Sequence, residues 1–272
     1  MLAESQALQE FIATIWDYYI QNKRNFVWRS HPTAYNVVVS EIMLQQTQTY
    51  RVAEKFDAFV AAFPDFRALA DAPFTEVLRL WKGLGYNRRA INLQKVAQAI
   101  AIEHAGELPA DPQILQKLPS IGPATAHSII TYAFNQPTMF IETNVRTVFI
   151  YFFFKNSTDV TDKMLEPLVR ATVDQHNPRE WYYALMDYGV MLKATVGNLS
   201  RNSAHYSKQS KFVGSDRQIR GMILQILLEQ PGIQLGLLPA TLDKQSERVE
   251  RIVRDLCKDG LIVITHETVW LA

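Results

Sequence analysis

Apolar residues recur at helical spacing along most of the chain. Near its start, Phe11, Ile15 and Tyr19 lie four residues apart, as on one face of a helix. The segment Tyr35–Gln45 has apolar residues on several faces, which predicts a helix that is largely buried. Its single acidic residue, Glu41, would then lie in an apolar environment, where burial raises the pKa of a carboxyl group.

Proline and glycine divide this helical pattern into segments. Pro73 begins a predicted helix that runs through Trp81, and two glycines follow it. The stretch Pro119–Gly122 predicts a tight turn, after which Pro123–Phe134 forms another helix. The sequence contains no internal repeat, and the pattern as a whole predicts an all-α protein.

The last third of the chain contains the one shift in composition. Residues 193–214 are polar, contain no acid and carry four basic residues, so we expect a linker or surface loop with a local charge of +4. Beyond it, Ile219–Ile226 and Val249–Leu256 have the spacing of amphipathic helices, and Leu261–Leu271 has the alternation of a β-hairpin. This pattern therefore predicts a small winged-helix-like module over residues 215–272.

Composition excludes several classes of protein. The chain has 28 basic and 27 acidic residues, and this near-zero balance neither indicates nor excludes a nucleic-acid partner. The longest apolar run, which contains Phe149–Phe154 and the valine before it, is far shorter than the roughly 20 residues that cross a bilayer, so we expect no membrane span. The N-terminus lacks the features of a secretory signal. A single cysteine, Cys257, excludes an internal disulfide and any all-cysteine metal centre.

Three short motifs place polar or glycine residues inside an apolar helical context. They are SEIMLQQTQ (Ser40–Gln48), WKGLGYNRRA (Trp81–Ala90) and LPSIGPATA (Leu118–Ala126). In this order, and followed by FIETNVRTV (Phe140–Val148), they resemble the helix-hairpin-helix DNA glycosylases of the endonuclease III superfamily. The resemblance covers about two-thirds of the chain and is strongest to the MutY-type adenine glycosylases.

The resemblance implies both a fold and a reaction. The fold is an all-α, two-lobed helix-hairpin-helix core over residues 1–214, to which the winged-helix-like module is added. The reaction is monofunctional hydrolysis of a base–deoxyribose bond in double-stranded DNA, as in base excision repair, with adenine as the first choice. We expect a cytoplasmic, nucleoid-associated monomer. The alternatives are another mismatched or damaged base, and a DNA-binding homologue without catalysis; a winged-helix regulator would leave Ser40–Gln48 unexplained.

Three residues are the predicted catalytic set. A buried Glu41 has the raised pKa that suits a general acid, and the resemblance implies that it protonates the extruded base and helps to activate water. Glu142 stands where the family has an aspartate that stabilises the charge developing on the sugar. The longer glutamate implies a reshaped pocket or reduced activity; otherwise it is a helix-capping acid. Asn144 matches an asparagine that holds the backbone near the site, unless it is an ordinary N-cap.

The resemblance also assigns residues that bind the base and the duplex. Gln46 and Tyr86 would fill the space left by an extruded base, unless they are an exposed amide and a packed aromatic. Ser120 replaces the customary first glycine of the hairpin and should strain or slightly reshape its turn. The predicted base pocket contains Trp28, Arg29, Leu44 and Asp187. The predicted DNA contacts are Gln46, Thr47, Tyr86, Arg88, Ser120, Gly122, Ala124, Lys208 and Lys211.

Several expected features of the family are missing. Bifunctional relatives carry a lysine at the position of Ala124, so no Schiff base is expected here. The positions that match four iron–sulfur cysteines are Lys193, Ser200, Ser203 and Gln209, so we expect neither a cluster nor any other cofactor or metal. The residues after 214 are too few for the domain that reads the opposite base in MutY-type enzymes, so that reader is expected to be absent or replaced.

Overall fold

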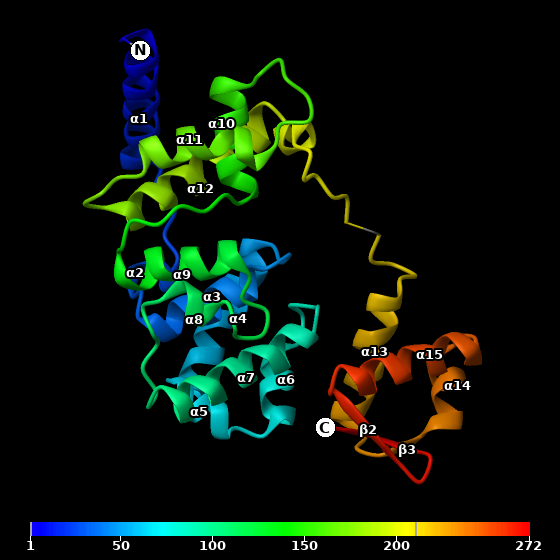
Figure 1. The fold of residues 1–272 in the computed structure, drawn as a ribbon. Helices are drawn as coiled ribbons and strands as arrows, with labels where there is room; N and C mark the ends of the chain where they lie inside the picture. Colours follow the sequence, from blue (N-terminus) through cyan, green and yellow to red (C-terminus); the bar gives the residue numbers. More distant parts are fainter. Residues whose placement is uncertain (1, 210) are drawn as a thin grey trace. The chain divides into compact units, whose positions relative to one another are not determined.

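The computed structural model describes residues 2–209 and 211–272, and it is built mostly of helices, with one small sheet near the C-terminus (Figure 1). The chain forms two compact units. The first contains the described residues up to Glu41 together with Pro109–Lys117 and Ile121–Lys208. The second contains Ile42–Leu108, Leu118–Ser120 and the described residues from Gln209 to Ala272. The predicted all-α class is confirmed.

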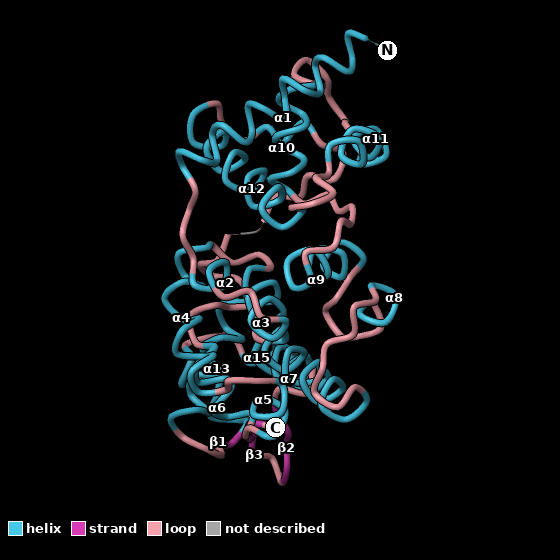
Figure 2. The backbone as a smooth tube through the Cα atoms, turned by 90° about the vertical axis from the view of Figure 1, so that its left-hand side faces the viewer, coloured by secondary structure: helices cyan, strands magenta, loops and turns pink. Residues whose placement is uncertain are grey.

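The first unit is organised around one long helix, α12, which packs against α1, α9 and α10; α1, α10 and α12 lie together in both views (Figures 1 and 2). Phe11 of α1 meets the ring of Phe149 at a centroid distance of 5.0 Å and that of Trp181 at 5.9 Å. The apolar run Phe149–Phe154 thus forms the C-terminal part of α10, which is packed against other helices, and its cap. The helices of this unit are α1 (Leu2–Asn22), α2 (Val27–Ser30), most of α3 (Ala34–Leu44), α8 (Pro112–Leu115), α9 (Pro123–Phe134), α10 (Thr143–Phe153), α11 (Asp162–Thr172), α12 (Pro178–Thr195) and the 3-10 helix η1 (Leu199–Asn202).

The second unit begins with four helices whose apolar faces meet, with α5 and α6 both packed on α7. They are α4 (Thr49–Ala62), α5 (Phe66–Asp71), α6 (Phe74–Trp81) and α7 (Arg88–Glu103). Pro73 precedes α6 directly and Trp81 ends it, as the sequence predicts. The turn that follows has two glycines with positive φ, which no other residue type adopts as readily.

The C-terminal residues adopt the winged-helix order of elements. The elements are α13 (Asp216–Glu229), β1 (Ile233–Gln234), η2 (Leu235–Leu237), α14 (Leu238–Leu242), α15 (Ser246–Lys258), β2 (Ile262–Thr265) and β3 (Thr268–Leu271). The predicted hairpin is present, and His266 and Glu267 at its tip both have positive φ, as in a type I′ turn. The sequence did not indicate β1, which adds a third strand in the order β1-β3-β2.

This module shares its core with the helices of the second unit. Leu78 of α6 belongs to the same buried cluster as Ile219 and Ile223 of α13, and Ile91 of α7 packs against that cluster. The grouping of the C-terminal residues with Ile42–Leu108 follows from this shared core. The boundary between residues 214 and 215 stays a prediction.

Up to Tyr206, the polar stretch 193–214 is more ordered than a linker. Its first residues complete α12, and η1 then packs on α10. Ser203 forms a parallel bridge with Val160, and the backbone N–H of Ala204 donates to the carbonyl of Val160 at 3.1 Å. Serine hydroxyls and backbone pairing thus hold this stretch, which composition alone does not reveal. None of the helices in the described part of the chain has the length and apolarity of a membrane span.

A buried arginine holds the end of α3 and the turn before α7. One terminal nitrogen of Arg89 donates to the carbonyls of Ile42, Met43 and Gln45 at 2.8, 2.8 and 2.5 Å. The other donates to the Thr47 hydroxyl at 2.8 Å and to the carbonyls of Leu84 and Gly85 at 3.2 and 3.0 Å. Burial lowers the pKa of Arg89 only to about 10, so the guanidinium stays charged at neutral pH. It is therefore unavailable to a DNA phosphate.

Replacing Arg89 by lysine tests this arrangement. The three donors of an ammonium group cannot serve six oxygens on two segments, so Arg89→Lys should lower the free energy of unfolding by about 2–4 kcal/mol. Denaturant titration measures this change. Arg88 is the matched control because its side chain is 68% exposed, and Arg88→Lys should change the free energy by less than about 0.5 kcal/mol. Equal effects of the two substitutions would contradict the assigned role of Arg89.

Candidate functional site

Two glutamates lie close together in the first unit. Glu41 is in α3 among buried residues, since Val38, Val39 and Ile42 have no exposed surface. Glu142 immediately precedes the first turn of α10. Both side chains keep some access to solvent, yet both are surrounded densely enough for burial to dominate their ionisation.

Burial, and after it the negative charge of Glu142, raise the pKa of Glu41 to about 8. Burial also raises the pKa of Glu142, while the positive charge of Arg146 opposes that rise. The two environments therefore differ. At neutral pH the pKa of about 8 favours a proton on Glu41, whereas Arg146 favours the charged form of Glu142. Such a difference is expected for a general acid and an electrostatic partner.

Ser128 of α9 stabilises both protonation states of Glu41. Its hydroxyl oxygen lies 2.5 Å from a carboxyl oxygen of Glu41 and 3.0 Å from the carbonyl of Thr125. A hydroxyl has one hydrogen, so it donates to one of these two oxygens at a time. It donates to Glu41 when that group is ionised. When Glu41 is protonated, the carboxylic acid donates to Ser128, which in turn donates to Thr125.

Close packing of α10 against α12 fixes the position of Glu142. Glu142 occupies the N-cap position of α10 but makes no capping hydrogen bond with its side chain, so it is not a helix-capping acid. Asn144 lies inside the helix rather than at its cap. Gly189 of α12 faces it, and a Cβ there would lie 2.8 Å from the Cβ of Asn144. Only glycine permits this approach.

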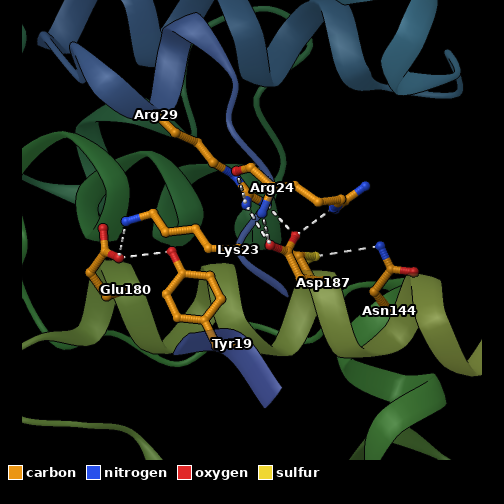
Figure 3. A network of polar contacts seen from close by, with 8 residues as sticks. Tyr19, Lys23, Arg24, Arg29, Asn144, Glu180 and Asp187 are labelled. Atoms are coloured by element: carbon orange, nitrogen blue, oxygen red, sulfur yellow. Dashed lines mark hydrogen bonds and ion pairs between the residues drawn. The ribbon is translucent and has the colours of Figure 1, made fainter. Parts of the chain in front are cut away.

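Asp187 is the centre of a buried ionic cluster (Figure 3). Its side chain is 1% exposed and accepts from both terminal nitrogens of Arg29 at 3.0 Å, and from the backbone N–H and Nε of Arg24 at 3.0 and 2.7 Å. Both carboxylate oxygens are therefore occupied. Of the predicted pocket residues, Asp187 positions Arg29 and has no oxygen left over to read a purine directly.

The surroundings of Arg29 are aromatic. Its guanidinium lies 4.4 Å from the ring centre of Tyr183, which stacks on Tyr132 at 4.8 Å. Trp28 is buried and stacks on Phe26 at 4.7 Å. The fourth predicted pocket residue, Leu44, is half-buried and belongs to the second unit.

The sequence analysis missed four residues that contact Glu41, Asp187 or Arg29 or stack beside them. They are Arg24, Ser128, Tyr132 and Tyr183. The only available signal was that Ser128 and Tyr132 lie four residues apart, on one face of α9.

Three predicted DNA-contacting residues of the second unit share a rare backbone conformation. Gln46, Tyr86 and Ser120 have φ of 54°, 48° and 65°, in the left-handed region that favours glycine. The predicted strain at Ser120 is thus present. Asn92 donates to its hydroxyl at 2.6 Å and Gln45 to its carbonyl at 3.0 Å, so the strained turn is held from both sides. Strain maintained in this way is typical of functional sites.

The remaining residues that were predicted to contact DNA differ in how exposed they are and in whether other residues already bind them. Thr47 uses its hydroxyl to bind Arg89 and the carbonyl of Leu84, so its role is structural support. Arg88 is exposed and lies 3.5 Å from Asp259. Four others are exposed: Gly122 and Ala124 around the start of α9, and Lys208 and Lys211 in the polar stretch.

The donor set of the polar stretch does not fit an iron–sulfur cluster. Ser200 and Ser203 are buried; the hydroxyl of Ser200 donates to Asn198 and that of Ser203 accepts from the N–H of His205. Neither they nor Lys193 and Gln209 supply the thiolates such a cluster requires. Among the described residues, no group of three or more His, Cys, Asp or Glu side chains is placed to hold a metal ion.

Comparisons with known proteins agree with this geometry. The chain is 32% identical over 187 residues to the adenine DNA glycosylase of Buchnera aphidicola, covering 67% of this chain and 52% of that protein. It is 29% identical over 270 residues to the adenine DNA glycosylase of Mycolicibacterium smegmatis, covering 92% of each. A solved thermostable thymine-DNA glycosylase shares the fold, with a TM-score of 0.63 and 23% identity, over 70% of this chain and 88% of that one.

The lengths of these proteins differ, since the chain spans about half the length of the Buchnera relatives that it matches. The family model matches the segment that carries Glu41, Ser120 and Glu142. Through residues 39–171, the chain belongs to the HhH-GPD superfamily of base excision DNA repair proteins.

Proposed function

We propose that the protein is a monofunctional DNA glycosylase that hydrolyses the N-glycosidic bond of a mispaired or damaged base in double-stranded DNA. The observation that carries this proposal is the pair of half-buried carboxyls, Glu41 with a pKa of about 8 and Glu142 beside it. The names of the adenine-specific relatives make adenine the first candidate base. Another mismatched or damaged base is the alternative.

In the proposed reaction, Glu41 donates its proton to a ring nitrogen of the base as the bond to C1′ of the sugar breaks. The base leaves with the bonding electron pair, and the carboxylate of Glu142 stabilises the positive charge on the sugar. Water then adds to C1′ and returns a proton to Glu41. The products are the free base and an abasic site in an uncut strand.

The absence of a lyase step rests on Ala124. This residue lies in the first turn of α9, and its methyl group cannot attack C1′. We therefore expect no strand scission without alkali and no complex trapped by borohydride. The protein is further proposed to work without iron, because the polar stretch offers hydroxyl, amide and amine groups in place of thiolates.

Removing the proton of Glu41 tests the proposal. Glu41→Gln keeps the size of the side chain but cannot donate a proton to the base, so base release should fall to background while DNA binding changes little. The assay incubates duplexes that contain each candidate mispair or lesion and then cleaves abasic sites with alkali. The control is Glu166→Gln on α11, where the side chain is 44% exposed. Undiminished base release by Glu41→Gln would contradict the role of Glu41.

The same variant has an independent pH readout. The folded-state pKa of Glu41 is raised above its ordinary value of 4.5, so this carboxyl contributes most to stability below about pH 4.5 and progressively less as pH rises to about 8. Glu41→Gln should therefore raise the Tm relative to the parent protein at pH 8, but not at pH 4.5. Base release by the parent should decline above about pH 8.

Shortening Glu142 tests whether the site has adapted to the longer side chain. Because its backbone is fixed by the packing of α10 on α12, Glu142→Asp should move the carboxylate away from the sugar by about an ångström and slow base release by about 10- to 100-fold. Glu142→Ala should be slower still. Single-turnover kinetics measure both rates, with Glu166→Asp as the control. Faster release by Glu142→Asp would show that Glu142 is a poor substitute for aspartate.

The exposed lysines of the polar stretch provide a test of phosphate binding. Lys208 and Lys211 lie in an acid-free segment, so we propose that both contact the DNA backbone. Their replacement by alanine should reduce the slope of log affinity against log salt by about 1.8 units. The loss of affinity should be the same for all duplexes. The paired control replaces the exposed Lys155 and Lys163. An unchanged slope would show that the two lysines do not contact phosphates and that the segment only connects its neighbours.

A further inference from the structure

A fully buried serine on α9 has more acceptors around it than its one hydrogen can serve. Ser128 has no exposed surface, and its hydroxyl oxygen lies 2.5 Å from Oε2 of Glu41 and 3.0 Å from the carbonyl oxygen of Thr125. A helical serine that donates to the carbonyl three or four residues earlier is ordinary. A carboxyl as the second neighbour is not, and it makes the orientation of this hydroxyl matter to Glu41.

The two orientations of the hydroxyl suit two protonated forms of Glu41. When Ser128 donates to Thr125, its oxygen accepts the proton that Glu41 carries on Oε2. When Ser128 donates to Oε2, that oxygen is the acceptor and the proton of the acid lies on Oε1. Glu41 keeps some access to solvent, so water can remove the proton from Oε2 and return one to Oε1. The carboxyl carries one proton in both forms.

Only the second form suits the transfer of a proton to another molecule. A proton on Oε2 is directed at the buried hydroxyl, whereas a proton on Oε1 is not shared with Ser128. After the proton has left Oε1, the hydroxyl still donates to Oε2 and stabilises the carboxylate that remains. This bond strengthens as the proton leaves, because hydrogen bonds to an ionised acceptor are about twice as strong as those between neutral groups.

We propose that Ser128 is a positioning residue that controls proton transfer from Glu41, by holding the proton on Oε2 in the resting site and by donating to Oε2 when the proton leaves from Oε1. The proposal deepens the proposed function and rests on it, because it concerns the general acid of that reaction. Ser128 neither gains nor loses a proton overall, so its effect is exerted through Glu41.

The charged groups that face Glu41 set the background against which Ser128 acts. Burial raises the pKa of Glu41 most, and the charge of Glu142, next to α10, raises it as well. The Ser128 hydroxyl and the charge of Arg29 on α2 lower it. Loss of the Ser128 hydroxyl should therefore move the titration of Glu41 to higher pH.

Two tyrosines also lie near this carboxyl, one on α9 and one on α12. Burial and the charge of Glu41 both raise the pKa values of Tyr132 and Tyr183, so both phenols stay neutral below about pH 10. Neither therefore contributes to a change in base release near pH 8.

Removing the hydroxyl tests the proposal. Ser128→Ala should slow single-turnover base release by about tenfold at pH 7, because the carboxylate formed at Glu41 lacks a hydrogen bond. The decline of base release above about pH 8 should move to higher pH by about one pH unit, so the ratio of the variant rate to the parent rate rises with pH. Ser128→Thr keeps the hydroxyl and should retain the pH profile of the parent.

Thr172→Val is the matched control. It removes another buried hydroxyl from a helix of the first unit, one that lies 2.9 and 3.1 Å from the carbonyl oxygens of Leu168 and Val169. Any loss of rate in this variant should be the same at every pH, and denaturant titration checks that each variant is folded. A rate ratio for Ser128→Ala that is also independent of pH would overturn the assignment and leave Ser128 a structural residue.

Infrared difference spectroscopy gives a second readout, which needs neither DNA nor base release. The C=O stretch of a protonated carboxyl is followed against pH in the Glu142→Gln background, and subtraction of the Glu41→Gln, Glu142→Gln double variant assigns the band to Glu41. Addition of Ser128→Ala should raise the midpoint of this titration, whereas addition of Thr172→Val should not. A midpoint that Ser128→Ala leaves unmoved would overturn the assignment.

The two readouts separate this proposal from the proposed function. A midpoint that rises in Ser128→Ala, in a protein that releases no base from any duplex, would refute the glycosylase proposal and keep the control of Glu41 by Ser128. Base release by the parent protein, together with an unmoved midpoint, would do the reverse.

Discussion

The buried guanidinium of Arg89 is the interaction on which the arrangement of the second unit depends. A helix leaves its last carbonyls without intrahelical partners, and glycine at the C-terminal end is the common solution. Here α3 ends without one, because Arg89 binds the carbonyls of Ile42 and Met43. The same group binds Gly85 next to Tyr86, so both turns are fixed from one point. The strain of the left-handed backbone at Gln46 and Tyr86 is thus offset by the hydrogen bonds of Arg89, which would break if these turns relaxed.

In the first unit, the central constraint is the charge balance around Glu41. A buried carboxyl keeps its proton at neutral pH only where no strong cation faces it, and Arg29 lies close enough to lower the pKa of Glu41. Asp187 accepts two hydrogen bonds from Arg29 and thereby offsets much of its field. The buried pair keeps a cation beside the aromatic rings without forcing Glu41 to ionise.

Local patterns in the sequence were sufficient for most of the fold. Burial of α3 followed from apolar residues on several of its faces, and the winged-helix module followed from helical spacing and then alternation in 58 residues. The resemblance supplied both carboxylates. The partners of these residues were beyond reach, because Ser128 lies 87 residues from Glu41 and Asp187 lies 163 from Arg24. Periodicity describes a face of a helix and does not say which distant residue that face meets.

The polar stretch after α12 is held by backbone pairing and by polar side chains. Its backbone pairs with Val160, and the adjacent Asp162 accepts two hydrogen bonds from Arg146 at 2.6 and 2.8 Å while its N–H donates to His205. Arg146 also lies close enough to lower the pKa of Glu142. The negative charge of Asp162 offsets part of the positive charge of Arg146, so Arg146 lowers the pKa of Glu142 less than an unpaired guanidinium would. Asp162 therefore contacts the polar stretch through His205 and, through Arg146, also affects the ionisation of the second carboxylate.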